Sequence, residues 1–343
     1  MAATSPTPRV PVIDFALFEA AETWRDHVAA QVDWAASEFG FFYVTGHGVS
    51  PTVIDRLLKL SRAFFSQDVA VKRRIDMSLG GRAWRGYFPV GGELTSGRPD
   101  LKEGIYFGEE LSDDDARVRA GLPLHGRNLF PDIPGFREAV LDYTSALTAL
   151  SHRLMACIGR GLRIGESYFS ERYTAEPTTL FRIFNYPAAE QADSHGVGAH
   201  TDYGLLTLLY QDEVGGLEVK HGAHWIDVPY VPGSFVVNIG DMLERLTAGR
   251  YTSALHRVIN RSGRERISMP FFFDPAFDAQ LHPIEGVGPL VDRHERIERW
   301  DGINLRDVHG TYGDYLIGKV ARVFPELGRD HLVEKGLSEP AAR

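Results

Sequence analysis

The spacing of apolar residues along the chain changes near residue 178, from a helical period to short runs separated by turns. In helical segments apolar residues recur so that one face is buried. The segments with this period are 20–38, 51–66, 133–161 and 312–324. Gly40 follows the first, Pro51 opens the second and Gly161 lies near the end of the third, as is common at helix boundaries. We therefore predict four helices.

Short strands are predicted where apolar runs lie between turn signals. Two precede residue 50, at 10–15 and 41–44. The others are expected near 180–186, 205–211, 216–220, 225–229, 234–239, 253–260 and 266–273. Many short strands at this spacing are typical of a sandwich or jelly roll. We predict a mainly β protein with flanking helices, in the α+β class.

The same pattern predicts one compact catalytic body built from four segments. We expect an N-terminal region of strands and helices, a linking region with the long helix, a jelly-roll core, and a C-terminal helical segment with a frayed tail after 335. These segments are 8–125, 126–175, 176–280 and 281–343. Residues 78–104 are rich in Gly, Pro and charge without a regular period. Such a segment is more often functional than idle.

Composition narrows the class of protein. The 343 residues are 43% hydrophobic and 24% charged, which is ordinary for a globular protein. A net charge of −9 argues against a nucleic-acid surface. The one cysteine, Cys157, excludes an intrachain disulfide and a Cys-rich zinc site. We see no secretory signal and no membrane-spanning stretch, and expect a cytoplasmic protein.

The chemistry is indicated by His200-Thr201-Asp202, followed further along the chain by His256. Residues i and i+2 of a strand point to the same side, so His200 and Asp202 can reach one ion. Two imidazoles and a carboxylate on one side of a metal form the facial triad of non-haem Fe(II) oxygenases, with other coordination positions open. An H-x-D triplet alone is weak evidence in a chain with thirteen His.

The second half of the pattern is Arg266-Ile267-Ser268. Arg266 and Ser268 also stand two residues apart, so a guanidinium and a hydroxyl can grip one end of a dicarboxylate. The structural alternative for Arg266 is a surface ion pair with Glu265 or Glu244. The ordered set of H-x-D, a distal His and R-x-S is much more specific than its parts.

With these motifs the chain resembles the Fe(II)- and 2-oxoglutarate-dependent dioxygenases of the isopenicillin-N-synthase-like type. The N-terminal signatures that match are Val10–Phe15 and Gly40–Val49. In the second half the matching motifs are Asn185-Tyr186-Pro187, His200-Thr201-Asp202, Gly240-Asp241, His256-Arg257-Val258 and Arg266-Ile267-Ser268. The resemblance implies a double-stranded β-helix core.

The resemblance also implies ligands. His200, Asp202 and His256 would be the iron ligands, and Arg266, Ser268 and Tyr186 would hold 2-oxoglutarate. Asn185 either orients the keto acid or closes the turn before Pro187. The implied cofactors and co-substrates are Fe(II), 2-oxoglutarate and O₂, with ascorbate as a stimulant. The implied reaction couples decarboxylation of 2-oxoglutarate, to succinate and CO₂, to C–H oxidation of a small metabolite.

Within the family, the chain is most similar to a bacterial branch that includes the ethylene-forming enzyme, which also binds arginine. The positions that match its arginine site are Glu93, Thr95, Arg182, Tyr203 and Arg322. Glu93 can receive a cationic group or be a solvated loop acid; Arg182 and Arg322 can bind a carboxylate or form structural ion pairs. Ser268, Asn185 and Tyr186 depart from that enzyme's residues, which disfavours ethylene formation and is compatible with ordinary hydroxylation.

Other functions remain in competition. A family member can fragment 2-oxoglutarate or oxidise its substrate without it, although the intact Arg266-x-Ser268 pair disfavours the latter. A non-catalytic jelly-roll binding protein would have lost ligands that are all present here. A hydrolase is disfavoured because H-E-x-x-H, G-x-S-x-G and phosphate-cradling motifs are missing from the sequence. The pattern predicts oxidation of a small metabolite such as an amino acid, by hydroxylation, desaturation or ring closure.

Overall fold

The structure is a computed structural model that describes residues 9–188, 195–288, 299 and 301–325. The described strands form two sheets. The major sheet has eight strands in the order β1-β2-β10-β7-β12-β5-β4-β3. Its strands are β1 (Val12–Asp14), β2 (Phe41–Thr45), β3 (Gly86–Phe88), β4 (Glu103–Gly108), β5 (Thr178–Tyr186), β7 (Leu206–Gln211), β10 (Phe235–Ile239) and β12 (Arg266–Asp274).

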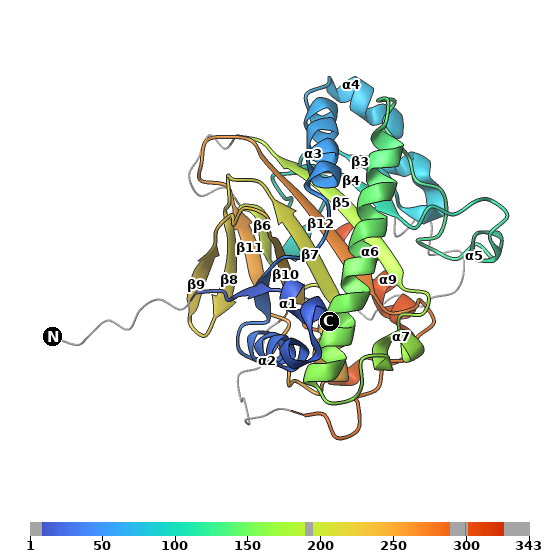
Figure 1. The fold of residues 1–343 in the computed structure, drawn as a ribbon. Helices are drawn as coiled ribbons and strands as arrows, with labels where there is room; N and C mark the ends of the chain where they lie inside the picture. Colours follow the sequence, from blue (N-terminus) through green and yellow to red (C-terminus); the bar gives the residue numbers. More distant parts are fainter. Residues whose placement is uncertain (1–8, 189–194, 289–298, 300, 326–343) are drawn as a thin grey trace.

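The minor sheet has four strands in the order β6-β11-β8-β9, all antiparallel to their neighbours. Its strands are β6 (His195–His200), β8 (Leu217–His221), β9 (His224–Val228) and β11 (His256–Ile259). Figure 1 shows this sheet beside the larger one. Chain order alternates between the sheets, because β6, β8 and β11 pair in the minor sheet while β5, β7, β10 and β12 belong to the major one. This is the predicted double-stranded β-helix core.

Helices cover the outer face of the major sheet. The long helix α6 (Phe136–Gly161) lies along it with α3 beside one end and α2 beside the other (Figure 1). Its buried stripe includes Tyr143, Leu147, Leu150 and Leu154, residues at the spacing of one helix face. The remaining helices are α1 (Ala16–Ala20), α2 (Glu22–Glu38), α3 (Pro51–Phe65), α4 (Val69–Lys72), α5 (Ala116–Arg119), α7 (Tyr168–Arg172), α8 (Asp241–Leu246) and α9 (Tyr312–Val323).

Most predicted elements are confirmed with small shifts at their ends. The helix predicted over 20–38 is found as α2, with the short α1 before it. Three strands were missed: β3, β4 and β6. The sequence of β6 is HGVGAH, whose two glycines and two histidines hide the alternation that marks a strand. The expectations for residues 1–8 and for the tail after 335 lie outside the described residues.

Two predictions about the whole chain can be checked. Cys157 is a buried free thiol on α6, and burial raises its pKa, so it behaves as a core residue. Within the described part of the chain, every helix is too short or too polar to span a membrane.

Candidate metal centre and substrate pocket

His200, Asp202 and His256 converge at the inner side of the minor sheet. His200 ends β6 and His256 begins β11, and the two residues are paired across the strands. The Nε2 atoms of both histidines lie 3.7 Å from Oδ1 of Asp202. The three candidate ligand atoms lie within 4.8 Å of one another, close enough to bind one ion. Among the described residues this is the one such His, Cys, Asp or Glu cluster.

The remaining polar atoms of these side chains are already bound. Nδ1 of His200 donates to the Gly198 carbonyl at 2.8 Å, and Nδ1 of His256 donates to the Ala254 carbonyl at 3.1 Å. With Nδ1 donating, the neutral form of each ring has Nε2 as an acceptor. Oδ2 of Asp202 accepts from Thr207 Oγ1 at 2.5 Å and Asn238 Nδ2 at 2.7 Å. Such outer hydrogen bonds orient metal ligands and fix the tautomer.

The electrostatics of the cluster suit a cation. Burial, together with the nearby His256, lowers the pKa of His200 to about 3, so its imidazole is neutral at physiological pH. Burial favours protonation of Asp202, but His256, His200, Thr207 and Asn238 outweigh it and lower the pKa of that carboxyl. A metal site requires neutral imidazoles and an ionised carboxylate. The residues present therefore fit a divalent ion with two nitrogens and one oxygen.

Arg266 and Ser268 lie further along the same pocket. Arg266 is fully buried; its Nε donates to the Gly215 carbonyl at 2.5 Å and its Nη2 to Gln211 at 3.3 Å. Nη1 is buried and, among the described residues, has no hydrogen-bond partner. Leaving a buried charged donor unpaired is costly, so this atom is poised for an anionic ligand.

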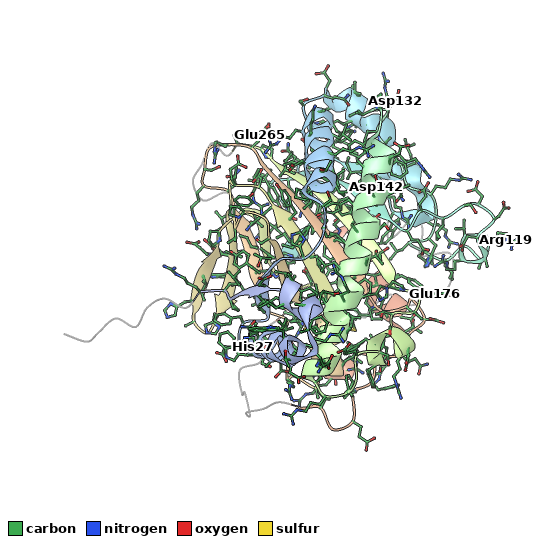
Figure 2. The ribbon with its side chains drawn as sticks, in the orientation of Figure 1. His27, Arg119, Asp132, Asp142, Glu176 and Glu265 are labelled. Atoms are coloured by element: carbon green, nitrogen blue, oxygen red, sulfur yellow. The ribbon has the colours of Figure 1, made fainter. Side chains whose placement is uncertain are left out.

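Tyr186 completes the same corner of the pocket. The Arg266 guanidinium lies 4.6 Å from the centre of the Tyr186 ring, and the Ser268 and Tyr186 hydroxyls are 3.5 Å apart. Glu265, in contrast, is exposed at the outer edge of the β11–β12 connection (Figure 2). The surface ion pair considered for Arg266 is therefore wrong.

Asn185 faces the opposite way. Alternation along β5 sends Arg182, Phe184 and Tyr186 into the pocket and the intervening side chains to the other side of the sheet. Nδ2 of Asn185 donates to Glu103 at 3.0 Å. Of the two roles considered for Asn185, the structure supports neither contact with the keto acid nor closure of the turn; its amide binds β4.

Arg182, Glu93, Thr95 and Tyr203 line the other part of the pocket. The Arg182 guanidinium lies between the Tyr106 and Phe272 rings, at 4.1 and 4.7 Å from their centres. Its Nη1 is 3.5 Å from Oε1 of Glu93, whereas its buried Nε has no hydrogen-bond partner in the described part of the structure. Glu93 is 2% exposed, so it is not a solvated loop acid.

Arg322 does not join this group. Its Nη1 lies 3.2 Å from the Asp301 carbonyl and 3.4 Å from an Asp301 carboxylate oxygen. Among the described residues, those that line the pocket include Leu316 of α9 but not Arg322. The expectation that Arg322 contacts the substrate is corrected by this ion pair.

Sequence reasoning missed several residues of the site: Asp100, Lys102, Thr207, Asn238 and Asp274. Asp100 and Lys102 lie in the 78–104 segment whose irregular, charged sequence had marked it as functional. Thr207 and Asn238 gave no signal, because a polar residue inside a predicted strand does not reveal which carboxylate it will bind. Asp274 ends β12 on the same face as Arg266 and Ser268, so alternation along that strand could have found it.

The candidate metal ligands, Arg266 and Arg182 line one pocket, in which water-sized spheres can occupy about 80 Å³. The apolar part of its lining is formed by Phe41, Leu180, Phe184, Val197, Leu209, Leu217, Val258, Pro270, Phe272 and Leu316. Metal ligands, the Arg266 corner and the Arg182 corner thus open on one cavity.

The chain matches two family models. Residues 176–275 match the 2OG-Fe(II) oxygenase superfamily, and residues 10–133 match the N-terminal region described as that of a non-haem dioxygenase in morphine synthesis. The first match covers the strands that carry the triad and Arg266.

Relatives cover nearly the whole chain. An iron/ascorbate oxidoreductase of Dictyostelium discoideum is 46% identical over 93% of this chain and 96% of its own length. A 1-aminocyclopropane-1-carboxylate oxidase of Dictyostelium mucoroides is 37% identical with the same coverages. An Arabidopsis thaliana homoarginine-6-hydroxylase is 38% identical over 87% of this chain and 90% of its own.

The fold also matches solved structures. Neurospora crassa T7H in complex with alpha-KG has a TM-score of 0.73 and 25% identity, covering 93% of this chain and 98% of that one. The fold, the converging His-Asp-His cluster and the relatives agree. The chain belongs to the 2OG-Fe(II) oxygenase superfamily and is a non-haem Fe(II)/2-oxoglutarate-dependent dioxygenase.

Proposed function

We propose that the protein hydroxylates a small amino acid whose side chain ends in a cationic group. The observation that carries this proposal is the Arg182–Glu93 pair. A buried guanidinium, whose Nε has no hydrogen-bond partner among the residues the structure describes, and a buried carboxylate lie together in the cavity that holds the triad. Arg182 is suited to the α-carboxylate of an amino acid and Glu93 to its cationic end.

The rest of the site supplies the cofactors. His200, Asp202 and His256 would hold Fe(II) through Nε2, Oδ1 and Nε2. Nη1 of Arg266, with the Ser268 and Tyr186 hydroxyls, would bind the distal carboxylate of 2-oxoglutarate. When bound, iron, 2-oxoglutarate and O₂ supply an oxidant for an unreactive C–H bond while 2-oxoglutarate becomes succinate and CO₂. The pocket residues orient the target carbon and exclude water.

Relatives support the same substrate class. Homoarginine-6-hydroxylases of several plants are among them, and the resemblance to an arginine-binding branch points the same way. We propose hydroxylation as the outcome, with ascorbate as a stimulant that helps keep iron reduced. A cytoplasmic, reducing compartment and a role in secondary metabolism belong to the same proposal; the free thiol of Cys157 is compatible with it.

The test is a screen with matched substrates. Arginine and homoarginine are compared with the near-isosteric neutral analogues citrulline and homocitrulline, in the presence of Fe(II), 2-oxoglutarate and O₂. We expect hydroxylated product and succinate in a one-to-one ratio for the cationic compounds. Binding is followed anaerobically by the change in the visible absorption of the iron–keto acid complex. Equal binding of cationic and neutral members of each pair would contradict the proposal.

The same screen separates the alternatives. Product without succinate would indicate oxidation independent of 2-oxoglutarate. 1-Aminocyclopropane-1-carboxylate should be included in the screen, because oxidases of this compound are among the relatives. Ethylene release would indicate fragmentation of 2-oxoglutarate. Glu93→Gln should lower affinity for the cationic substrate while leaving the Michaelis constant for 2-oxoglutarate unchanged.

A further inference from the structure

Lys102 is a fully enclosed ammonium at the wall of the substrate pocket. Its side chain is 2% exposed, and Nζ lies 2.9 Å from Oε2 of Glu93 and 2.6 Å from Oδ2 of Asp100. The ammonium also lies 4.6 Å from the centre of the Phe184 ring. Two carboxylates therefore share one buried cation, and buried ion pairs are screened less than exposed ones.

Asp100 fixes Lys102 to the strand that carries His200. Oδ2 of Asp100 accepts from Thr95 Oγ1 at 2.5 Å, and Oδ1 accepts from the Gly198 N–H at 3.4 Å. The Gly198 carbonyl in turn accepts from His200 Nδ1. Because β6 is an edge strand of the minor sheet, a side chain can bind this N–H. The segment that bears Glu93 is thus tied to the metal centre through Asp100.

Glu93 depends on its neighbours for its orientation. Oε1 accepts from the Tyr106 hydroxyl and faces Arg182, while Oε2 faces Lys102. We infer that Lys102 is a positioning residue that determines substrate charge specificity, because its ammonium holds the Glu93 carboxylate in the orientation that receives the cationic end of the substrate. This inference rests on the proposed function.

Loss of the Lys102 ammonium would change the protonation and the orientation of the Glu93 and Asp100 carboxyl groups. Glu93 and Asp100 would face one another without the cation between them, and buried like charges favour protonation of one carboxyl. A proton shared by the two would leave Glu93 neutral for part of the time and free to turn. The groups that face Glu93 are then Tyr106 and Arg182, and neither replaces the lost cation on Oε2.

The experiment compares Lys102→Met with Lys72→Met. Lys72 is a matched control because its ammonium is also buried, 2.7 Å from Glu103, and belongs to no part of the pocket lining described above. Dissociation constants for arginine and citrulline, and for homoarginine and homocitrulline, are measured by anaerobic titration calorimetry on the enzyme with Fe(II) and 2-oxoglutarate.

We expect the wild type and Lys72→Met to prefer the cationic member of a pair by about 10-fold or more, as for a charge-assisted hydrogen bond. In Lys102→Met the preference should fall to less than about 3-fold and recover as the pH rises, because the shared proton is then lost. An unchanged preference, or a larger one, in Lys102→Met overturns the inference. If the wild type itself does not prefer the cationic substrates, the result contradicts the proposed function and not the role of Lys102.

A second comparison keeps the inference testable if Lys102→Met folds poorly. Lys102→Arg retains the positive charge and should retain most of the preference. In the Glu93→Gln background, either change at Lys102 should have little further effect on preference, because the carboxylate that Lys102 positions is gone. Loss of the preference in Lys102→Arg, or full additivity of the effects of Glu93→Gln and Lys102→Met, would contradict the positioning role.

Discussion

At the scale of single residues, the site keeps some polar atoms bound and leaves others free. Oδ2 of Asp202 accepts hydrogen bonds from Thr207 and Asn238, whereas Oδ1 faces the candidate metal cluster. Nε and Nη2 of Arg266 donate to the protein, whereas Nη1 has no hydrogen-bond partner among the described residues. Both residues line the shared pocket, so these atoms are the ones available to ligands.

Arg266→Ala tests the 2-oxoglutarate corner. We expect the Michaelis constant for 2-oxoglutarate to rise roughly 10–100-fold, as for loss of a charge-assisted hydrogen bond, with a smaller change for the primary substrate. Arg266→Lys should be intermediate, since it keeps the charge without the planar fork. Arg264→Ala is the control, because Arg264 is exposed. Equal changes for both substrates would remove Arg266 from this role.

Asp274 gives a pH-dependent prediction for the metal-free protein. Burial is the main cause that raises its pKa from 3.8 to about 7, and Asp202 adds to it. The native state then keeps this proton up to about pH 7, whereas the unfolded chain releases it near pH 3.8. The contribution of Asp274 to stability is therefore complete below pH 3.8 and is lost as the pH rises through 7.

Asp274→Asn removes this titration. The unfolding free energy of the variant relative to the wild type should increase between pH 4 and 7.5, by at most roughly 4 kcal/mol. Urea unfolding at several pH values measures it, with the exposed Asp278, changed to Asn, as the control. Parallel pH profiles for wild type and Asp274→Asn would show that the buried carboxyl does not titrate in this range.

Residue types and spacing were enough to predict the triad and the Arg266-x-Ser268 pair, because i and i+2 in a strand share a side. They were not enough for Lys102 or for Arg322. Whether a charged residue faces the pocket or a neighbour depends on contacts between segments far apart in sequence, such as Arg322 with Asp301. The roles of the site residues as ligands stay predictions until tested.

At the scale of secondary structure, pairs of strands hold the ligands. Asn238 on β10 lies opposite Thr207 on β7, and both side chains bind the same oxygen of Asp202. His200 and His256 are likewise opposite one another on β6 and β11. The major sheet thus orients the carboxylate while the minor sheet presents the imidazoles, so the site forms only when both sheets pack together.

Thr207→Val tests this arrangement, since it keeps the side-chain shape and removes one hydrogen bond to Asp202. We expect roughly 10–100-fold weaker Fe(II) binding, the usual cost of losing an outer hydrogen bond to a metal ligand. Thr148→Val on α6 removes a hydroxyl that binds only the backbone of its own helix and should leave Fe(II) affinity unchanged. Wild-type affinity in Thr207→Val would show that Asn238 alone suffices to orient Asp202.

Strand prediction succeeded where apolar alternation was clear and failed at the three-residue β3, at β4 and at the glycine-containing β6. The predicted ends of β7, β8, β10 and β12 lie within one residue of the observed ends. The missed β6 carries His200, and its glycines allow close packing: a Cβ on Gly196 would lie 2.7 Å from the Tyr186 ring. Close approach between ligand-bearing strands thus removed the apolar pattern that prediction needs.

At the scale of the whole molecule, residues of both sheets and of α9 line one pocket that contains the candidate metal cluster, Arg266 and Arg182. The double-stranded β-helix was predicted from the resemblance, and the strand spacing alone indicated only a sandwich or jelly roll. The order β1-β2-β10-β7-β12-β5-β4-β3 brings together strands far apart in sequence. A single sequence shows each strand but not its partners, so this order could not be derived from period and turns.

The most direct measurement of the central claim is an anaerobic titration with Fe(II) and 2-oxoglutarate, followed by the visible absorption of the iron–keto acid complex. The wild type and the exposed control His309→Ala should bind one equivalent of Fe(II) and develop the band. Each of the three variants His200→Ala, Asp202→Ala and His256→Ala should bind Fe(II) weakly and fail to develop the absorption band. Wild-type Fe(II) affinity and a full band in all three variants would contradict the assignment of this cluster as the iron site.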